Sequence, residues 1–412
     1  MIRKSGDLSG NIRVTAPRLG CGLTVTSPTT ITNVIRGPLT KQSGVFLLAM
    51  GEIGNRRDVE RAEMGTSVLR RLYLGSLMLG VATVLFSIVA ASVGPFTIPF
   101  THTAGVLLDL AGIGESTAKP TEQAIIQIIR LPRIFLAFVV GAALGISGGI
   151  MQGLFRNSMA DPGIIGVSSG GALGAVIAIA SGASTVATLF LPLFAFIGSA
   201  VSMVVVFLIA SVGGRFSIVT LLLGGIAVAS FLGAITTAII ILTDDLNVQR
   251  QIVFWIAGGF DTARWESVQI AAPIIGVGAL ITVFFARDLN LLLVSEDEAR
   301  SLGVRVGLVR NTLLVSASLI TGTAVAFSGI IAFVGLVVPH VVRLVVGADH
   351  RVLLPLSALG GGLFLLMADT AARVVLSPAE LRVGILTSLI GAPFFIYLLV
   401  RSRATISERL GG

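Results

Sequence analysis

A short charged stretch between long apolar runs is the first candidate for chemistry in this sequence. It reads Ser295-Glu-Asp-Glu-Ala-Arg-Ser-Leu-Gly-Val304, and the runs on both sides are long enough to cross a bilayer. A charged helix on the aqueous side of a membrane domain does not help that domain to sit in lipid. We therefore interpret residues 295–304, called the charged segment below, as a contact site for a soluble partner.

Arginines near the ends of apolar runs form the second candidate. Arg130 and Arg133 flank a proline before one run, and Arg373 ends a later run. A guanidinium binds a carboxylate through paired, directional hydrogen bonds, which suits a contact that must fix an orientation. The alternative is that these side chains only mark the membrane interface. Asp369 lies within the last turns of a run, where an unpaired carboxylate is costly, so we expect it to be paired.

Nothing in the sequence argues for catalysis by this chain. None of the histidines, His102, His340 and His350, has a second His or Cys at the spacing of metal ligands, and the one cysteine, Cys21, predicts neither a disulfide nor a metal site. A Gly-rich phosphate loop ending in Lys-Ser or Lys-Thr is missing. We expect no metal site, no cofactor and no enzymatic activity, and any ATP hydrolysis must come from another chain.

The composition places the chain in a membrane. Of its 412 residues 54% are hydrophobic, 12% are charged and 49 are glycines, and a helix needs roughly 20 apolar residues to cross about 30 Å of hydrocarbon. The glycines let helix backbones approach closely, which predicts a packed bundle. The sequence thus predicts an all-α, polytopic fold of about ten transmembrane helices near residues 72–93, 134–154, 162–181, 188–212, 217–242, 267–286, 311–330, 331–346, 352–372 and 383–400.

The positions of Lys and Arg orient these spans. The run 311–342 could be a single tilted helix, but splitting it near Gly329 places Arg343 and Arg351 on the same side as Arg287. Both termini are then cytoplasmic, in the plasma or inner membrane, and the positive-inside rule is obeyed. This rule explains the net charge of +8, so no nucleic-acid partner is implied. The cationic residues left outside are Lys119, Arg130, Arg133, Arg250, Arg264, Arg373 and Arg382.

The N-terminal residues differ from the rest. Residues 1–65 are rich in Ser, Thr, Gly, Asn and Arg, and their one apolar patch, 45–50, is too short to span a membrane. It does not resemble a signal peptide, and Met64 could be the true start. We predict a disordered tail over 1–65 and a permease domain of ten helices over 66–412.

A series of motifs now resembles the FecCD/BtuC-type permease family, which imports iron-siderophores, haem and cobalamin by ATP-driven type II transport. The resemblance covers about residues 70–403. It is carried, in order, by Arg130-Leu-Pro-Arg133, Gly141-Ala-Ala-Leu-Gly-Ile-Ser-Gly-Gly-Ile-Met-Gln152, Phe155-Arg-Asn-Ser-Met-Ala-Asp-Pro-Gly-Ile-Ile-Gly-Val-Ser-Ser-Gly170, Trp255-Ile-Ala-Gly-Gly-Phe260, Glu298-Ala-Arg-Ser-Leu-Gly303, Gly335-Leu-Val-Val-Pro-His340, Asp349-His-Arg-Val-Leu-Leu-Pro355, Ala368-Asp369 and Gly391-Ala-Pro393.

The resemblance implies partners and roles for both candidate sites. Family members pair two permease subunits, identical or different, bind two cytoplasmic ATPases and receive substrate from an extracytoplasmic binding protein. The charged segment would contact the ATPase through Glu296, Glu298, Ala299, Arg300, Leu302 and Gly303. Arg130, Arg133 and Arg373 would receive acidic residues of the binding protein, with Arg382 as a weaker fourth. By the same resemblance, spans five (221–241) and ten (383–400) would line the substrate path.

Other classes of protein fit the sequence less well. An ion-coupled secondary transporter should show inverted repeats and acids near mid-membrane, and Asp369 is the one candidate acid. A membrane-embedded enzyme needs grouped His, Asp or Glu, and a receptor without transport needs no charged segment. Within the importer class we expect a ferric siderophore first, haem second, and cobalamin or another chelate after them.

Overall fold

The computed structural model describes residues 68–212, 216–377 and 379–410, together with three short strands before them; side chains are described to residue 400. The chain divides into two units, Met1–Ser67 and Val68–Gly412. In the first unit β1 (Ser5–Gly6), β2 (Ile12–Thr15) and β3 (Gly22–Val25) form an antiparallel sheet in the order β1-β2-β3, with Ser5 opposite Arg13 and Ile12 opposite Val25. The predicted disorder of residues 1–65 concerns mostly residues outside the described part, so it stays a prediction.

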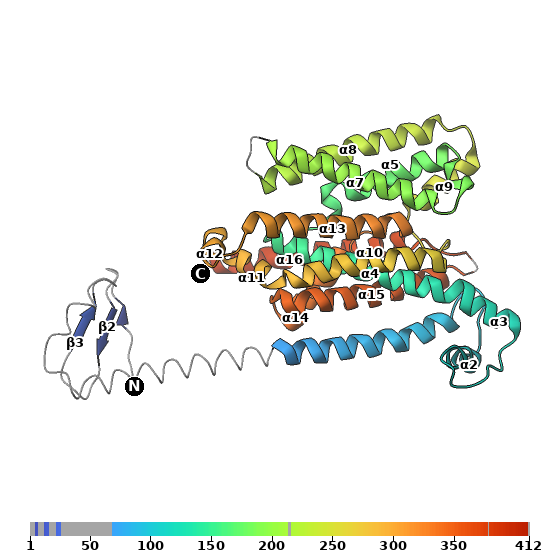
Figure 1. The fold of residues 1–412 in the computed structure, drawn as a ribbon, viewed down its shortest axis with the longest axis horizontal. Helices are drawn as coiled ribbons and strands as arrows, with labels where there is room; N and C mark the ends of the chain where they lie inside the picture. Colours follow the sequence, from blue (N-terminus) through green and yellow to red (C-terminus); the bar gives the residue numbers. More distant parts are fainter. Residues whose placement is uncertain are drawn as a thin grey trace. The chain divides into compact units, whose positions relative to one another are not determined.

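The second unit is a helical bundle that confirms the predicted fold class (Figure 1). Eight helices of the described chain are long and apolar enough to cross a membrane, and two shorter apolar helices bring the bundle to the expected ten. The spanning helices are Val68–Ser92, Pro120–Leu154, α7 (Phe190–Ala210), α8 (Ile218–Leu242), α10 (Trp265–Phe284), α13 (Val306–Ser328), α15 (His350–Val374) and the part Val383–Val400 of α16 (Val383–Leu410), with α5 (Val167–Ala180) and α14 (Val334–Val346) as the shorter pair.

The split of the run 311–342 falls where the sequence predicts it. α13 ends at Ser328, Gly329 has a φ of +69°, and α14 begins at Val334 after Phe333, whose φ is +68°. Both residues are in the left-handed region that a continuous helix cannot use, and glycine adopts it without a steric cost. The chain therefore turns back here, as the ten-span topology requires.

Span two begins earlier than predicted. The helix runs from Pro120 through α3 (Pro120–Ala124), the π-helical turn η2 (Ile125–Arg130) and α4 (Leu131–Leu154). Pro132 has no N–H, so the helix must leave a carbonyl without its usual partner, and the wider π turn just before it absorbs that change. Arg130 and Arg133 consequently lie within a continuous helix and not in a loop at its mouth.

Small connecting elements gather at the two ends of the bundle (Figure 1). One end, called the α12 end, carries the short helices α11 (Ala286–Val294) and α12 (Glu296–Ser301). The other end, called the α3 end, carries α2 (Phe100–Leu110), α3, α6 (Ala183–Val186) and α9 (Leu246–Ile256). η3 (Pro162–Ile165) precedes α5 inside the bundle, and Asp161 caps it by accepting a hydrogen bond from the Gly163 N–H at 2.7 Å.

Glycines determine which helices pack most closely. On α4 and α15, Gly141 and Gly361 face each other so closely that a Cβ on either would overlap the backbone of the other. Gly170 of α5 and Gly198 of α7 are related in the same way. Because apolar side chains gain nothing from leaving lipid, such backbone contact supplies the packing energy, as the sequence predicts.

Candidate functional site: a charge cluster and an exposed helix at opposite ends

At the α3 end, Asp369 of α15 joins two arginines. The Arg133 Nε and Nη2 groups donate to the Asp369 carboxylate at 2.9–3.2 Å, and the Arg373 Nε lies 3.4 Å from Asp369 Oδ2. Asp369 is 1% exposed, Arg133 8% and Arg373 3%. The expected pairing of Asp369 is therefore confirmed, and it connects α4 to α15.

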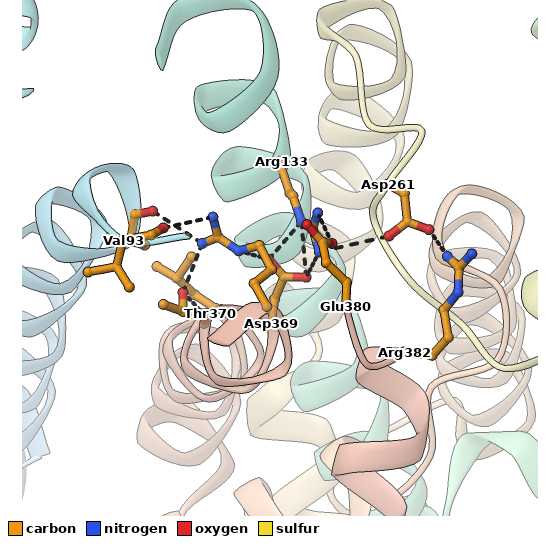
Figure 2. A network of polar contacts seen from close by, with 10 residues as sticks. Val93, Arg133, Asp261, Asp369, Thr370, Glu380 and Arg382 are labelled. Atoms are coloured by element: carbon orange, nitrogen blue, oxygen red, sulfur yellow. Dashed lines mark hydrogen bonds and ion pairs between the residues drawn. The ribbon is translucent and has the colours of Figure 1, made fainter. Parts of the chain in front are cut away.

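The cluster extends outward through two loops (Figure 2). The Arg133 Nη1 donates to Glu380 Oε2 at 2.9 Å, and Asp261 Oδ1 lies 3.9 Å from the Arg133 Nη2. Asp261 also pairs with Arg382, whose guanidinium lies 4.7 Å from the Phe254 ring centroid. Burial and the nearby Arg133 lower the pKa of Arg382 below its ordinary value. Arginines and carboxylates alternate through the cluster, so its charges compensate one another.

Arg130 and Arg373 donate hydrogen bonds to backbone carbonyls at the C-terminal end of the first helix, Val68–Ser92. Backbone carbonyls of its last turn have no partner within the helix. The Arg373 guanidinium donates to the carbonyls of Ala90 at 3.1 Å and Val93 at 3.2 Å, and Arg130 donates to those of Ala91 and Phe96. The cations also suit the negative end of the helix dipole. Within the described chain, Arg130 makes these contacts to carbonyls and none to a carboxylate.

The predicted docking arginines thus lie together, but each is engaged inside the subunit. Arg130 is 5% exposed, similar to Arg133 and Arg373. This engagement was not predictable from the sequence, because Arg130 and Arg133 are distant in the chain from the residues that hold them, such as Phe96 and Asp369. Their contact with a partner protein stays a prediction. By contrast Arg250, in α9, is exposed and has no partner in the described residues.

Asp261 and Arg382 border a cleft of about 300 Å³ at this end. α9 contributes polar groups from Asn247, Arg250 and Gln251 to this cleft, and the aromatic side chains in its lining are Phe254 and Trp255 of α9 and Phe327 of α13. α9 was not among the predicted elements, although its residues 246–256 combine polar and apolar positions at a helical period. The cleft gives a side chain from outside a route to the loops that carry the cluster.

At the α12 end the charged segment forms a short helix with both ends capped. The Ser295 hydroxyl accepts the Glu298 N–H at 3.0 Å. At the other end Gly303 has a φ of +86°, and the N–H groups of Gly303 and Val304 bond to the carbonyls of Arg300 and Ala299, a pattern that glycine favours. The segment therefore keeps a defined shape between α11 and α13.

The predicted contact residues divide by exposure. Ala299 is fully buried against the bundle, and Glu296 lies 3.5 Å from Arg300 and 3.7 Å from Arg310 of α13, which fastens the helix to the bundle. Glu298, Arg300 and Leu302 face outward, and Leu302 is 67% exposed. A leucine that exposed beside charges, at the aqueous end of a bundle, is available to a partner. Gly303 is needed for its backbone conformation.

Comparison with known proteins identifies the fold and the family. The FecCD transport family model matches residues 81–401. The cobalamin import permease BtuC of Halobacterium salinarum is 49% identical over 68% of this chain and 74% of its own length, and the hemin transport permease HmuU of Yersinia pestis is 44% identical over 67% and 83%. The iron(3+)-hydroxamate import permease FhuB of Bacillus subtilis is 43% identical over 69% and 73%.

A solved structure agrees with these relatives. It is described as an inward-facing metal-chelate type ABC transporter, is 32% identical, covers 79% of this chain and 98% of its own, and has a TM-score of 0.69. The bundle is thus that of a membrane-spanning permease of an ABC importer. The chain belongs to the FecCD transport family.

Proposed function

We propose that this protein is the permease subunit through which an ABC importer brings a ferric siderophore into the cytoplasm. The observation that carries the transport role is α12, a capped helix between spans six and seven that presents Glu298, Arg300 and Leu302 at one end of the bundle. This placement suits a subunit that receives mechanical work from a separate ATPase. Two such permeases, identical or different, would surround the path, with two ATPases at the α12 end.

The charge distribution supports a cytoplasmic α12 end. Arg70, Arg71, Arg287, Arg305 and Arg351 lie at that end of the described bundle, as the positive-inside rule expects of cytoplasmic loops. The α3 end would then face outward and receive a substrate-binding protein at the charge cluster. Both termini would be cytoplasmic.

The substrate path is proposed along α8 and α16. Exposed positions of α8 include Leu223, Ala227, Ser230, Ala234 and Thr237, which follow one helical face. Small and apolar side chains of this kind let a bulky ligand pass without strong binding. α16 likewise exposes apolar residues such as Ile385, Leu389 and Ile396. Pairing of two subunits would bring such faces together.

An ion-coupled secondary transporter is less well supported. Its one candidate acid, Asp369, is bound by Arg133 and Arg373 at the α3 end and is not free to take up and release an ion. Reconstituted transport separates the two mechanisms. Uptake should require ATP and the ATPase subunit, and uptake driven by an ion gradient alone would reject the importer.

The substrate can be tested directly. Proteoliposomes with the permease, its ATPase and its binding protein would be offered a ferric hydroxamate, hemin or cobalamin, each labelled. We expect ATP-dependent accumulation of the ferric hydroxamate. Cobalamin and hemin are the second candidates, because relatives named for their import are 49% and 44% identical. Accumulation of either in place of the ferric hydroxamate would correct the substrate and leave the importer intact.

The role of α12 is tested by removing its exposed side chains. The double change Glu298→Ala and Leu302→Ala takes away a charge and an apolar contact while Ala299 and the caps keep the helix in place. Since a few exposed anchors carry most of the energy of an interface, the amount of ATPase that copurifies should fall about tenfold. Leu344→Ala, at a residue 72% exposed on α14, is the control and should retain the ATPase. Full ATPase binding and uptake by the double variant would reject this role.

A further inference from the structure

The charge cluster has a buried half and an exposed half. Asp369 is buried between Arg133 and Arg373, whereas the side chains of Glu380 and Asp261 are 32% and 37% exposed. Glu380 and Asp261 lie outside any helix, in the segments 379–382 and 257–264. The outer carboxylates can therefore move away at a smaller cost than Asp369 can.

Arg133 shares its N–H groups between the two halves. Its Nε and Nη2 bind Asp369, and its Nη1 points to Glu380 (Figure 2). Within the described residues, the Glu380 carboxylate makes hydrogen bonds to Arg133 alone. If Glu380 leaves, Asp369 still balances the charge of Arg133, and the Nη1 becomes free for another acceptor.

We propose that Glu380 is an internal competitor at the docking site. In the free permease it occupies the Arg133 Nη1, and on docking a carboxylate side chain of the substrate-binding protein takes its place while Glu380 moves into solvent. The inference rests on the proposed docking of that protein at the α3 end. It explains how an arginine that is 8% exposed can take part in an interface: the acid that covers it is the group that is exchanged.

Exchange of one carboxylate for another has a defined energetic consequence. A buried N–H group without an acceptor is costly, so a site without Glu380, in which the Arg133 Nη1 has lost its acceptor, would hold the incoming acid tightly. With Glu380 present, each departure of the binding protein restores an internal pair, so the complex dissociates more readily. The competitor thus lowers the affinity and favours repeated docking and release.

The test measures affinity between the permease–ATPase complex in nanodiscs and its own substrate-binding protein. Glu380→Gln and Glu380→Ala should each tighten binding about three- to tenfold, mainly through slower dissociation. Glu266→Gln is the matched control, because Glu266 is an exposed acid at the same end with no partner in the described residues. It removes an equal charge and should change affinity less than about twofold.

A second background separates competition from general electrostatics. Arg133→Lys keeps the positive charge and removes the forked donors, so the effect of Glu380→Gln should vanish in it. Unchanged or weaker binding by both Glu380 variants, or an equal gain in the Arg133→Lys background, would overturn the proposal. If uptake and docking persist in that case, the proposed function stands; if no variant of the importer docks the binding protein, the docking role itself fails.

Discussion

At the scale of residues, the guanidinium groups at the α3 end make contacts that stabilise the subunit itself. Arg130 and Arg373 satisfy carbonyls at the end of the first helix, and Arg133 with Asp369 joins α4 to α15. Reversing any of these arginines to Glu would place a carboxylate against carbonyls or against Asp369. Such variants would fold poorly, so a loss of docking could not be separated from a folding defect. Arg→Lys changes are better probes because they keep the positive charge.

Asp369 is expected to be the most sensitive residue of the cluster. Asp369→Asn leaves Arg133 and Arg373 close together without their buried carboxylate, and removing one partner of a buried pair costs about 3–5 kcal/mol. The variant should lose its folded, monodisperse peak in detergent at a clearly lower temperature than the parent. Glu266→Gln is again the control for loss of one acid. An unchanged unfolding temperature would show that the cluster does not stabilise the bundle.

The chemistry of this cluster was only partly predictable from the sequence. A carboxylate near the end of a span must be paired, and that much followed from the cost of burying it. Its partner Arg133 lies 236 residues away, and no local pattern connects the two. The sequence shows that Glu380 and Arg382 are charged, but it does not show their partners. Glu380 meets Arg133, and Arg382 meets Asp261, through tertiary packing alone.

At the scale of elements, the predicted spans lie within a few residues of the observed ones wherever glycine or a charge ends the apolar run. Gly329 is the clearest case, because its backbone conformation cannot continue a helix. The start of span two was missed for the opposite reason: Arg130 and Arg133 ended the predicted run at residue 134, yet the helix continues through them from Pro120. The apolar run in the sequence shows which residues can lie in lipid, but it does not show where the backbone hydrogen bonding of the helix begins.

The glycine contact between α4 and α15 should be essential to the bundle. Gly361→Val would force the two backbones apart, because its Cβ would overlap the Gly141 carbonyl. Overpacking of this kind costs about 1–3 kcal/mol or more, so the unfolding temperature and the folded yield should both fall. Gly276→Val on α10, where no atom lies within 4 Å of an added Cβ, is the matched control. Equal behaviour of both variants would show that close approach is not needed.

At the scale of the whole molecule, the helices of the bundle divide into an enclosed group and a peripheral group. Other helices bury most residues of α4, α13 and α15. By contrast, most residues of the first helix (Val68–Ser92), of α8 and of α16 are not buried within the subunit. The enclosed helices hold the charge cluster at one end and support α12 at the other. The proposed ATPase contact and the charge cluster are therefore held by the same enclosed helices.

The permease unit should function without the residues that precede it. The chain divides at Ser67, and the family model begins at residue 81, so a protein that starts at Met64 keeps every described helix of the bundle. We expect it to insert, bind the ATPase and support uptake at the parent rate per folded molecule.

A protein that starts at Leu77 is the matched control. It lacks Arg71, which donates to the Val346 carbonyl at 3.4 Å, and Gly75, which packs against Leu356. That shorter protein should lose stability, since part of a membrane span and its contact with α15 are gone. Loss of uptake by the Met64 protein at normal folded yield would show that residues 1–63 take part in transport.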